Sequence, residues 1–424
     1  MRNFRIPTPD ADRLGFDLYL GLSLKIAGAT AAFGLSWLIA HTYGAATLGL
    51  FQLGLATAVF LGTIATQGLD RIVMREVGKI ASASEHPVHW VLLKKALNRQ
   101  IILGIPLAIA LTAFSPIFSN EFLQQPNASG FLILLAPIIV LFPFVKTISA
   151  FLRVKKEVLR SQLLDGVTYT SFACLCLAFA WIFSAEWTNY LPAFAYTVGM
   201  LCAVTLNYIY TRRRYKRKSI ADHSLPFTPG MRVSLIITLN LSVDLVAMYA
   251  ISSNLGATEV GIYRVAIQFC LLFGLIDSSF TTMAAPYVIR HVADGNIDGV
   301  KSTVIKSAKH GALLCLPALL AILFFSDLLL SIFGQAFTSG ATPLKILAIG
   351  QFFSVACGPI GEALILMGKE KVILLIELLA LALALATIYF LLPIYGLIGA
   401  AMAAALAITL RNALPWAVFT FSQR

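Results

Sequence analysis

Charged residues are scarce in this sequence. Asp, Glu, Lys and Arg make up only 12% of its 424 residues, against about 25% in soluble proteins. Hydrophobic residues reach 58% and the mean hydropathy is +0.83. This scarcity excludes a soluble protein of this length, because a soluble surface needs charge on all its sides. Instead, apolar stretches of about 20 residues, long enough to span a bilayer as helices, follow one another along the chain.

Motifs for several kinds of chemistry are missing as well. The sequence has no Gly-x-x-x-x-Gly-Lys phosphate-binding motif, which argues against ATP hydrolysis. Its six cysteines lie in apolar stretches, and its six histidines lack the spacing of metal ligands. We therefore predict no disulfide framework, no metal site, no cofactor and no catalytic residues. The protein is not expected to be an enzyme.

The apolar stretches predict an all-α polytopic membrane protein with about 12 transmembrane helices. In hydrocarbon every backbone N–H and C=O needs a partner within its own segment, so runs of this length form helices and not open strands. The predicted helices run over approximately 16–40, 46–73, 96–118, 131–152, 159–183, 190–210, 231–251, 260–288, 308–333, 344–367, 372–392 and 395–419.

The loops between these helices alternate between basic and neutral. Short loops rich in Lys and Arg stay in the cytoplasm, so the basic set orients the protein with both termini cytoplasmic. The neutral set, which contains no Lys or Arg, comprises 41–45, 119–130, 184–189, 252–259, 334–342 and 393–394. The basic set comprises 71–99, 153–160, 212–218, 290–309 and 369–371.

The net charge of +12 invites a nucleic-acid interpretation, which the sequence does not support. The densest basic run, at 212–218, is a loop between two halves of the chain, where it would contact anionic lipid headgroups. No aromatic-interleaved groove or recognised nucleic-acid-binding fold accompanies it. We expect membrane lipids as partners and no nucleic acid.

Two copies of one motif indicate an internal repeat. The sequence YGAATLGLF at 43–51 returns as LGATEVGIY at 255–263, and the separation of 212 residues is half the chain. Pro106 is echoed within one position by Pro317. A tight turn with close helix packing would leave a similar motif, but the matching span count, length and orientation favour a duplication.

A duplication predicts three segments. These are an N-terminal six-helix bundle at 1–211, a basic cytoplasmic linker at 212–230 and a C-terminal six-helix bundle at 231–424. Because six is even, both bundles enter the membrane from the same side and are parallel repeats. Two such bundles around a central cavity are typical of a transporter that opens to either side by rocking.

Three stretches carry a family resemblance. The first span ends in YGAATLGLF at 43–51, the second runs into QGLDRIVMRE at 67–76, and the tenth ends in LMGKEK at 366–371. With these features nearly the whole chain resembles the polysaccharide biosynthesis transport family. The members of that family are flippases for undecaprenyl-diphosphate-linked oligosaccharides such as O-antigen units. Their superfamily includes the multidrug and toxin extruders and the lipid II flippases.

The resemblance implies a function and a set of partners. The substrate would be a lipid-linked oligosaccharide, an O-antigen or exopolysaccharide repeat unit. It would move from the cytoplasmic to the periplasmic leaflet of a bacterial inner membrane by alternating access. The resemblance also implies a role in lipopolysaccharide biosynthesis, with a polysaccharide polymerase or chain-length machinery as a partner.

Charges inside the predicted spans are the candidate substrate-binding residues, because a charge in hydrocarbon is costly and usually marks a pathway or has a partner. Lys25, near the middle of the first span, is the leading candidate. Asp244 is interpreted as its counterpart in the second half, either as a displaceable partner of a cation or in a structural ion pair. Arg264 and Arg411 suit a diphosphate, because a guanidinium donates two parallel hydrogen bonds.

Alternatives stay open for several of these charges. Arg264 either binds substrate or anchors the protein at the outer interface. Lys146 and Lys345 lie within reach of span ends, where an interfacial role is favoured. Pro286 is the preferred hinge, because it is expected to end the eighth helix. Further acidic residues within spans would neutralise the cations or carry a coupling ion: Asp165, Asp277, Glu362 and Glu377.

Two rival functions are less consistent with the sequence than the flippase. A cation-coupled multidrug exporter of the same superfamily would need an acidic cavity, whereas Lys25, Arg264 and Arg411 indicate a net-positive one. A membrane polysaccharide polymerase or ligase would need a sizeable outer loop with catalytic groups, and the neutral loops here are short. The leading hypothesis is therefore a lipid-linked oligosaccharide flippase.

Overall fold

The computed structural model describes residues 11–79, 86–182, 189–215 and 230–421. The regular elements in these ranges are helices. Ten of them are long and apolar enough to cross a membrane. The number is eleven when α4 (Ala128–Leu135) and α5 (Ile138–Val154), which are bent by 42°, count as one span. The expected all-helical polytopic fold is confirmed.

Helix α1 (Ala11–Thr66) contains two membrane passes. Its backbone leaves the helical conformation at Gly44, with φ 83° and ψ 173°. Gln52 Nε2 donates a hydrogen bond to Ser36 Oγ at 3.3 Å although the residues are 16 positions apart, a separation of about 24 Å in a straight helix. The chain therefore folds back at Gly44. Counting its arms 11–43 and 45–66 separately gives twelve passes among the described helices.

The second half repeats this reversal between α9 (Gly230–Leu255) and α10 (Ala257–Ala293). Gly256 has φ 100° and ψ 174°, close to the values of Gly44. Positive φ strains residues that carry a Cβ, which is why glycine occupies both positions. The structure thus confirms that the motifs at 43–51 and 255–263 correspond, with an offset of 212 residues.

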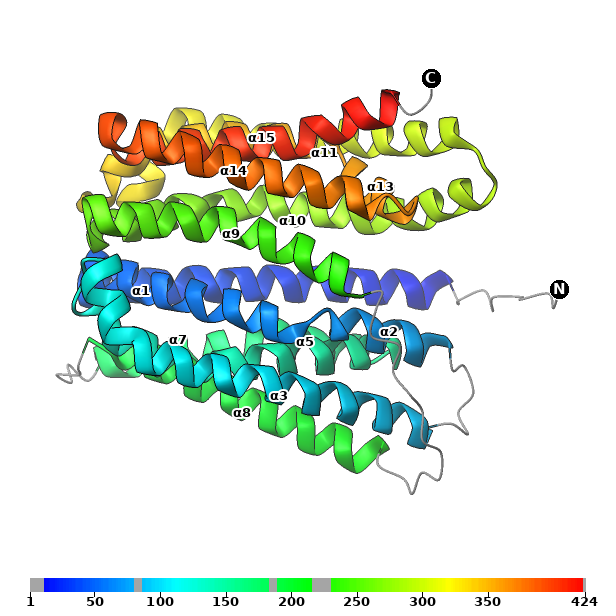
Figure 1. Cartoon of the computed structure of the whole chain (residues 1–424), viewed down its shortest axis with the longest axis horizontal. Coiled ribbons are helices and arrows are strands. Elements are labelled where there is room, and N and C mark those ends of the chain that lie inside the picture. The colour runs from blue at the N-terminus through cyan, green and yellow to red at the C-terminus, as the bar shows by residue number, and fades with distance from the viewer. Residues whose placement is uncertain (1–10, 80–85, 183–188, 216–229, 422–424) are drawn as a thin grey trace.

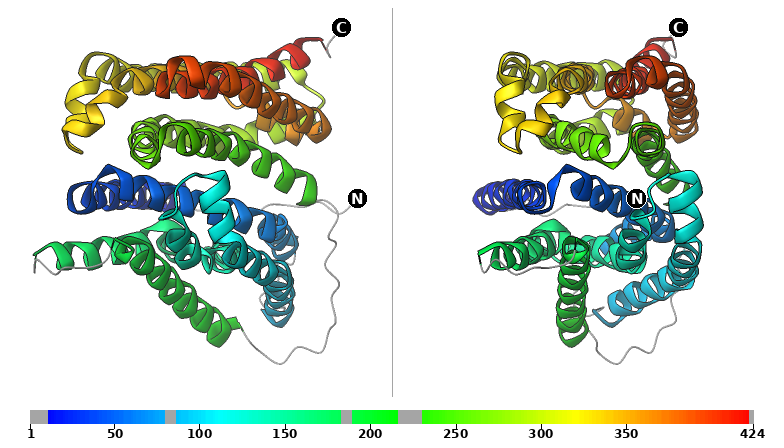
Figure 2. Two further views of the ribbon diagram at one scale, coloured as in Figure 1. Left: turned by 60° about the vertical axis from the view of Figure 1, so that its left-hand side comes forward. Right: turned by 90° about the vertical axis from the view of Figure 1, so that its left-hand side faces the viewer.

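The helices form two groups, shown in Figure 1 and in two further views in Figure 2. The group α1 to α8, here called the N-lobe, also contains α2 (Leu69–Lys79), α3 (His86–Ile117), the π-helix η2 (Phe118–Phe122), α6 (Val158–Gln162), the π-helix η3 (Leu163–Val167), α7 (Thr168–Ile182) and α8 (Leu191–Tyr215). The group α9 to α15, the C-lobe, also contains α11 (Ile297–Ser331), the 3-10 helix η4 (Gln335–Gly340), α12 (Ala341–Cys357), α13 (Ile360–Leu366), α14 (Glu370–Tyr395) and α15 (Leu397–Phe421).

Most of the expected linker 212–230 falls outside the described residues, so the domain boundary stays a prediction.

Several spans contain breaks that the hydropathy pattern did not predict. The second is interrupted at Gln67 and Gly68, which both have positive φ, and the tenth at Gly358. The bend between α4 and α5 contains Pro137, which lacks a backbone N–H to donate. Pro286, by contrast, does not end its helix as expected, because α10 continues to Ala293.

The two kinds of loop lie at opposite ends of the molecule. Helix α1 begins and helix α15 ends at the same end of the molecule in Figure 1, which we call the basic end; it also carries the turn between α10 and α11. The other end, called the neutral end, carries the reversals at Gly44 and Gly256 together with η2 and η4. The basic loops, which alternate with neutral loops along the sequence, thus gather at one end of the molecule, and the neutral loops gather at the other.

The lobes come into backbone contact through two glycines at the neutral end. A Cβ added at Gly49 would collide with the carbonyl oxygen of Ala257, and one added at Gly261 with that of Ala45. Helices α1 and α10 therefore cross backbone to backbone. Gly49 and Gly261 are equivalent positions of the repeat, and equivalent positions that touch must lie on the pseudo-two-fold axis relating the halves.

Aromatic and polar contacts extend this seam between the lobes. The ring of Tyr249 in the C-lobe packs edge-on against Phe118 and Phe122 of the N-lobe, with centroids 5.4 and 5.8 Å away. Trp37 Nε1 donates a hydrogen bond to the Ile332 carbonyl at 2.9 Å. These contacts hold the two lobes together in the neutral half of the molecule.

Candidate substrate-binding site

Arg264 of α10 contacts its own counterpart in the other lobe. Its Nη2 donates a hydrogen bond to Gln52 Oε1 at 3.3 Å, and the two residues are 212 positions apart, the offset of the repeat. Arg264 therefore lies on the pseudo-two-fold axis, about one turn from the glycine crossing. Its side chain is half-buried, and its Nε is buried without a hydrogen-bond partner among the described residues.

Asp244 of α9 is an anionic neighbour of Arg264. Its carboxyl group lies close enough to Arg264 and to Arg411 of α15 to interact with both charges. Within the described part of the chain, however, no salt bridge joins any two of these three residues. Arg264 thus keeps hydrogen-bond donors that an anionic ligand can use.

Arg411 lies in a different electrostatic setting. Besides Asp244, its charge acts on Asp277 of α10 and Glu377 of α14. Glu377 is only 4% exposed and has an Oε2 without a partner among the described residues. Three carboxyl groups thus interact with the charge of Arg411, whereas Arg264 on the axis interacts with Asp244 alone among them.

Lys25 lies apart from this cluster. It is exposed on the first arm of α1, about 28 Å along the helix from the reversal at Gly44. Arg264 is only about 12 Å from its own reversal. Asp244 is not the counterpart of Lys25, because the offset of the repeat pairs Asp244 with Ala32, about two turns closer to the neutral end. That interpretation was wrong, and a role of Lys25 in substrate binding stays a prediction.

Lys345 belongs to neither cluster by any contact between described residues. It is half-buried, one turn inside α12, which begins at the neutral end beside η4. That position is within reach of the membrane surface for a long side chain. Glu362 in α13 is exposed, and its charge acts on Asp277.

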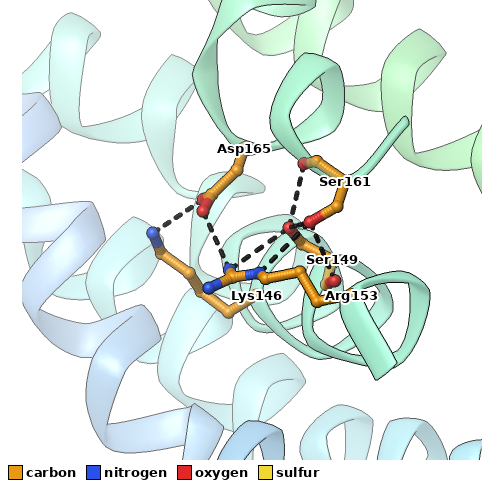
Figure 3. Close-up of polar contacts among 5 residues, drawn as sticks. All are labelled: Lys146, Ser149, Arg153, Ser161 and Asp165. Carbon is orange, nitrogen blue, oxygen red and sulfur yellow. Dashed lines mark hydrogen bonds and ion pairs between the residues drawn. The ribbon is translucent and has the colours of Figure 1, made fainter. Parts of the chain in front are cut away.

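The N-lobe brings together two residues that the sequence singled out separately, as Figure 3 shows. Lys146 Nζ of α5 donates a hydrogen bond to Asp165 Oδ1 at 2.8 Å, and Arg153 Nη2 donates one to Asp165 Oδ2 at 3.1 Å. Asp165 lies in η3, where the backbone departs from helical geometry at Asp165 and Gly166. Two cations therefore share one carboxylate.

Sequence reasoning missed two polar residues of these sites. Gln52 carries no charge and drew no attention, although the offset of 212 from Arg264 identifies it as the equivalent position. Arg153 was assigned to a basic loop but lies within the last turn of α5, one helical turn beyond Ser149. Among the described residues no group of three His, Cys, Asp or Glu side chains could hold a metal ion.

Comparison with protein families agrees with this architecture. The model of the family described as "Polysaccharide biosynthesis protein" matches residues 18–291, well over half of the chain. The chain belongs to the polysaccharide biosynthesis protein family. A second family model, MatE, matches residues 234–391, within the C-lobe.

One curated relative of this family member comes from Shigella flexneri and is named "Putative O-antigen transporter". It is 31% identical over 156 residues, which are 36% of this chain and 37% of that protein. The match therefore spans little more than a third of the relative's length.

Solved structures share the fold over almost the whole chain. The lipid II flippase MurJ in an inward closed conformation aligns with a TM-score of 0.75 at 14% identity, covering 93% of this chain and 87% of that one. An inward-facing multidrug resistance MATE family transporter aligns with a TM-score of 0.74 at 15% identity, covering 96% and 98%. At such identities the likeness establishes the fold, which is the fold of the expected superfamily.

Proposed function

We propose that this protein is a flippase that carries an undecaprenyl-diphosphate-linked oligosaccharide from the cytoplasmic to the periplasmic leaflet of a bacterial inner membrane. The cargo would be an O-antigen or exopolysaccharide repeat unit. The observation that carries the proposal is Arg264, a cation on the axis between two lobes with an unpartnered, buried Nε. Membership of the polysaccharide biosynthesis family and the name of the Shigella relative support this class of substrate.

The orientation of the protein in the membrane follows from the distribution of charge. The basic end faces the cytoplasm, because loops rich in Lys and Arg resist translocation. The contacts between the lobes lie at the neutral end, which then faces the periplasm. The conformation is accordingly one closed to the periplasm, in which a substrate would approach Arg264 from the cytoplasmic side.

Substrate binding to Arg264 provides a means of opening the seam. A diphosphate accepts charge-assisted hydrogen bonds, which are about twice as strong as bonds between neutral groups. It therefore competes well against the Gln52 amide oxygen, and the Arg264–Gln52 bond joins the two lobes. A ligand that binds one conformation more tightly shifts the population toward it. Loss of this contact on binding favours separation of the lobes at the periplasmic end.

One observation favours the rival multidrug exporter. The C-lobe cluster contains three carboxyl groups, Asp244, Asp277 and Glu377, next to Arg411. Such acids suit cationic drugs or a coupling cation. The axis itself carries Arg264, however, and a cationic drug at that position would meet a like charge. The flippase is the better explanation of the residue that both lobes share.

Two measurements separate these functions. Deletion of the gene should leave a lipid-linked oligosaccharide accumulated in the cytoplasmic leaflet, and mass spectrometry of extracted lipids would identify it. The extracted lipid and a cationic dye are then each tested with the purified protein in proteoliposomes. We expect translocation of the lipid and none of the dye. Dye export together with an unchanged lipid profile in the deletion strain would overturn the proposal in favour of the exporter.

A further inference from the structure

The N-lobe contains a group of cations that is separate from Arg264. Lys146 and Arg153 of α5 share the single carboxylate of Asp165. The group therefore carries one positive charge in excess. Neither cation is enclosed, because the side chains of Lys146 and Arg153 are 37% and 41% exposed.

Buried hydroxyls fix the direction of the Arg153 side chain. Its Nε donates a hydrogen bond to Ser161 Oγ at 3.2 Å, and its Nη2 donates one to Ser149 Oγ at 3.4 Å. Both serines are fully buried and also bond to each other at 2.8 Å. These bonds, drawn in Figure 3, hold the guanidinium in one orientation, while the Arg153 side chain stays partly exposed.

The cluster lies beside the helix that meets the other lobe. Phe142, whose ring lies 5.2 Å below Lys146 Nζ, packs against Gly62 on the second arm of α1. Val167 of η3 packs against Gly28 on the first arm. Lys146 is about 12 Å along α5 from its end at Val154, at the basic end. The cations therefore lie next to both arms of α1, in the half of the molecule opposite to the closed seam.

We propose that Lys146 and Arg153 form a docking site for the diphosphate group of the substrate at the basic end, and that Asp165 is the internal anion this diphosphate displaces. The inference rests on the proposed function and adds a first station ahead of Arg264. A diphosphate carries more charge and more acceptor oxygens than one carboxylate, so it can engage both cations together. Asp165 can give way because its backbone, with φ −82° and ψ 34°, is already outside the helical ladder.

This arrangement predicts that two substitutions change the affinity for a diphosphate in opposite directions. In Lys146→Gln one cation is lost, so affinity for a diphosphate should fall about tenfold, the size expected for one charge-assisted hydrogen bond. In Asp165→Asn the competing anion is lost, so affinity should rise several-fold. An ion pair that only stabilises the fold predicts no such opposition, because either change would simply break the pair.

The test measures binding of undecaprenyl diphosphate by native mass spectrometry of the full-length protein in phosphatidylcholine nanodiscs. Lys309→Gln is the matched control, since it removes one positive charge from an exposed position on α11 at the basic end. We expect wild-type affinity for that control. Lys146→Arg keeps the charge and should restore most of the binding lost in Lys146→Gln, which separates a loss of affinity from a loss of folding.

Four outcomes would overturn the inference. Equal affinity in Lys146→Gln, Asp165→Asn and wild type, with lowered thermal stability in both variants, would make the cluster a structural ion pair. A second outcome uses nanodiscs that contain equal amounts of phosphatidylglycerol and phosphatidylcholine. If phosphatidylglycerol displaces undecaprenyl diphosphate there, the cluster is an ordinary phospholipid site. Absence of undecaprenyl diphosphate binding to the wild type would contradict the proposed function itself, whereas binding lost only in Arg264→Ala would contradict the docking site alone.

Discussion

The two cationic sites of this protein differ in how their charges are satisfied. In the N-lobe, Lys146 and Arg153 bond directly to Asp165, at 2.8 and 3.1 Å. On the axis, Arg264 bonds only to a neutral amide, Gln52, at 3.3 Å, and its Nε has no partner among the described residues. The first site is held by charges within one lobe, and the second by a weak contact between lobes.

This difference indicates two different roles. Arg264 has the nearby charge of Asp244 but forms no salt bridge with any described residue. An arginine in that state is unfavourable in a membrane interior, so its presence points to a ligand that bonds to it directly. A pair of cations around one carboxylate is stable on its own and has a single charge left to attract an anion. A diphosphate would therefore meet a preformed site first and the site that controls the seam second.

The largest expected loss of transport comes from a change that keeps the two lobes from approaching each other. In Gly261→Leu the new side chain would collide with the Ala45 carbonyl of α1, so we expect flipping in proteoliposomes to be abolished. Gly274→Leu is the matched control on the same helix, because a Cβ there meets nothing within 4 Å. Equal activity of the two variants would show that the glycine crossing does not hold the axis together.

Loss of the axial cation should have the next largest effect. Arg264→Ala is expected to slow flipping about 100-fold, equivalent to about 2.7 kcal/mol. Arg264→Lys should recover part of the rate, since it keeps the charge but loses the planar fork. Arg71→Ala, at an exposed position on α2, is the control and should behave like wild type. A near-normal rate of flipping in Arg264→Ala would show that Arg264 is not the site that controls the seam.

Weakening the N-lobe site should affect stability more than transport. Ser161→Ala removes the hydroxyl that bonds to Ser149 and orients Arg153, so the free energy of unfolding should fall by about 1 kcal/mol. Ser302→Ala changes an exposed serine of α11 and should leave stability unchanged. The measurement is thermal unfolding of the purified protein in detergent. A stability loss as small as that of the control would mean that the hydroxyl pair does not support the site.

The smallest expected effect concerns a single hydrogen bond across the seam. Tyr249→Phe keeps the ring contacts with Phe118 but loses the 2.8 Å bond to Thr57, worth about 1 kcal/mol. The open population at the neutral end should rise about fivefold. Distances between spin labels at Ser129 and Ser331, measured by pulsed electron paramagnetic resonance, report this change.

A control for that experiment is Tyr190→Phe, which lies within the N-lobe against Phe131 and should leave the distances unchanged. Identical distance distributions in both tyrosine variants would show that the Thr57 bond contributes nothing to closure.

Much of the fold was predictable from the sequence because its determinants are local. Hydropathy located the membrane passes, and the glycine motifs identified the two reversals, at Gly44 and Gly256, with their matching backbone conformations. The breaks at Gln67 and Gly358 were missed, since an interrupted apolar run has the same hydropathy as a continuous one.

The candidate sites were predictable only as single residues. The sequence marked Arg264, Lys146 and Asp165 because each is a charge in an apolar stretch. It wrongly paired Asp244 with Lys25, because position within a predicted span is a poor guide to depth when the helix ends are uncertain. It also assigned Arg153 to a loop, because a basic residue near a span end has the same pattern whether it lies inside or outside the helix.

By itself the sequence determined that the chain crosses the membrane as helices, that its basic loops share one side, and that its two halves correspond. These properties depend on transfer of each segment from water to lipid and on the backbone freedom of glycine. Only the tertiary structure decided which polar side chains meet. Arg264 reaches Gln52, 212 positions away, and Lys146 reaches Asp165, 19 positions away. Such contacts depend on where helices cross, and the crossing of α1 and α10 at two equivalent glycines is what puts an arginine on the axis of the molecule.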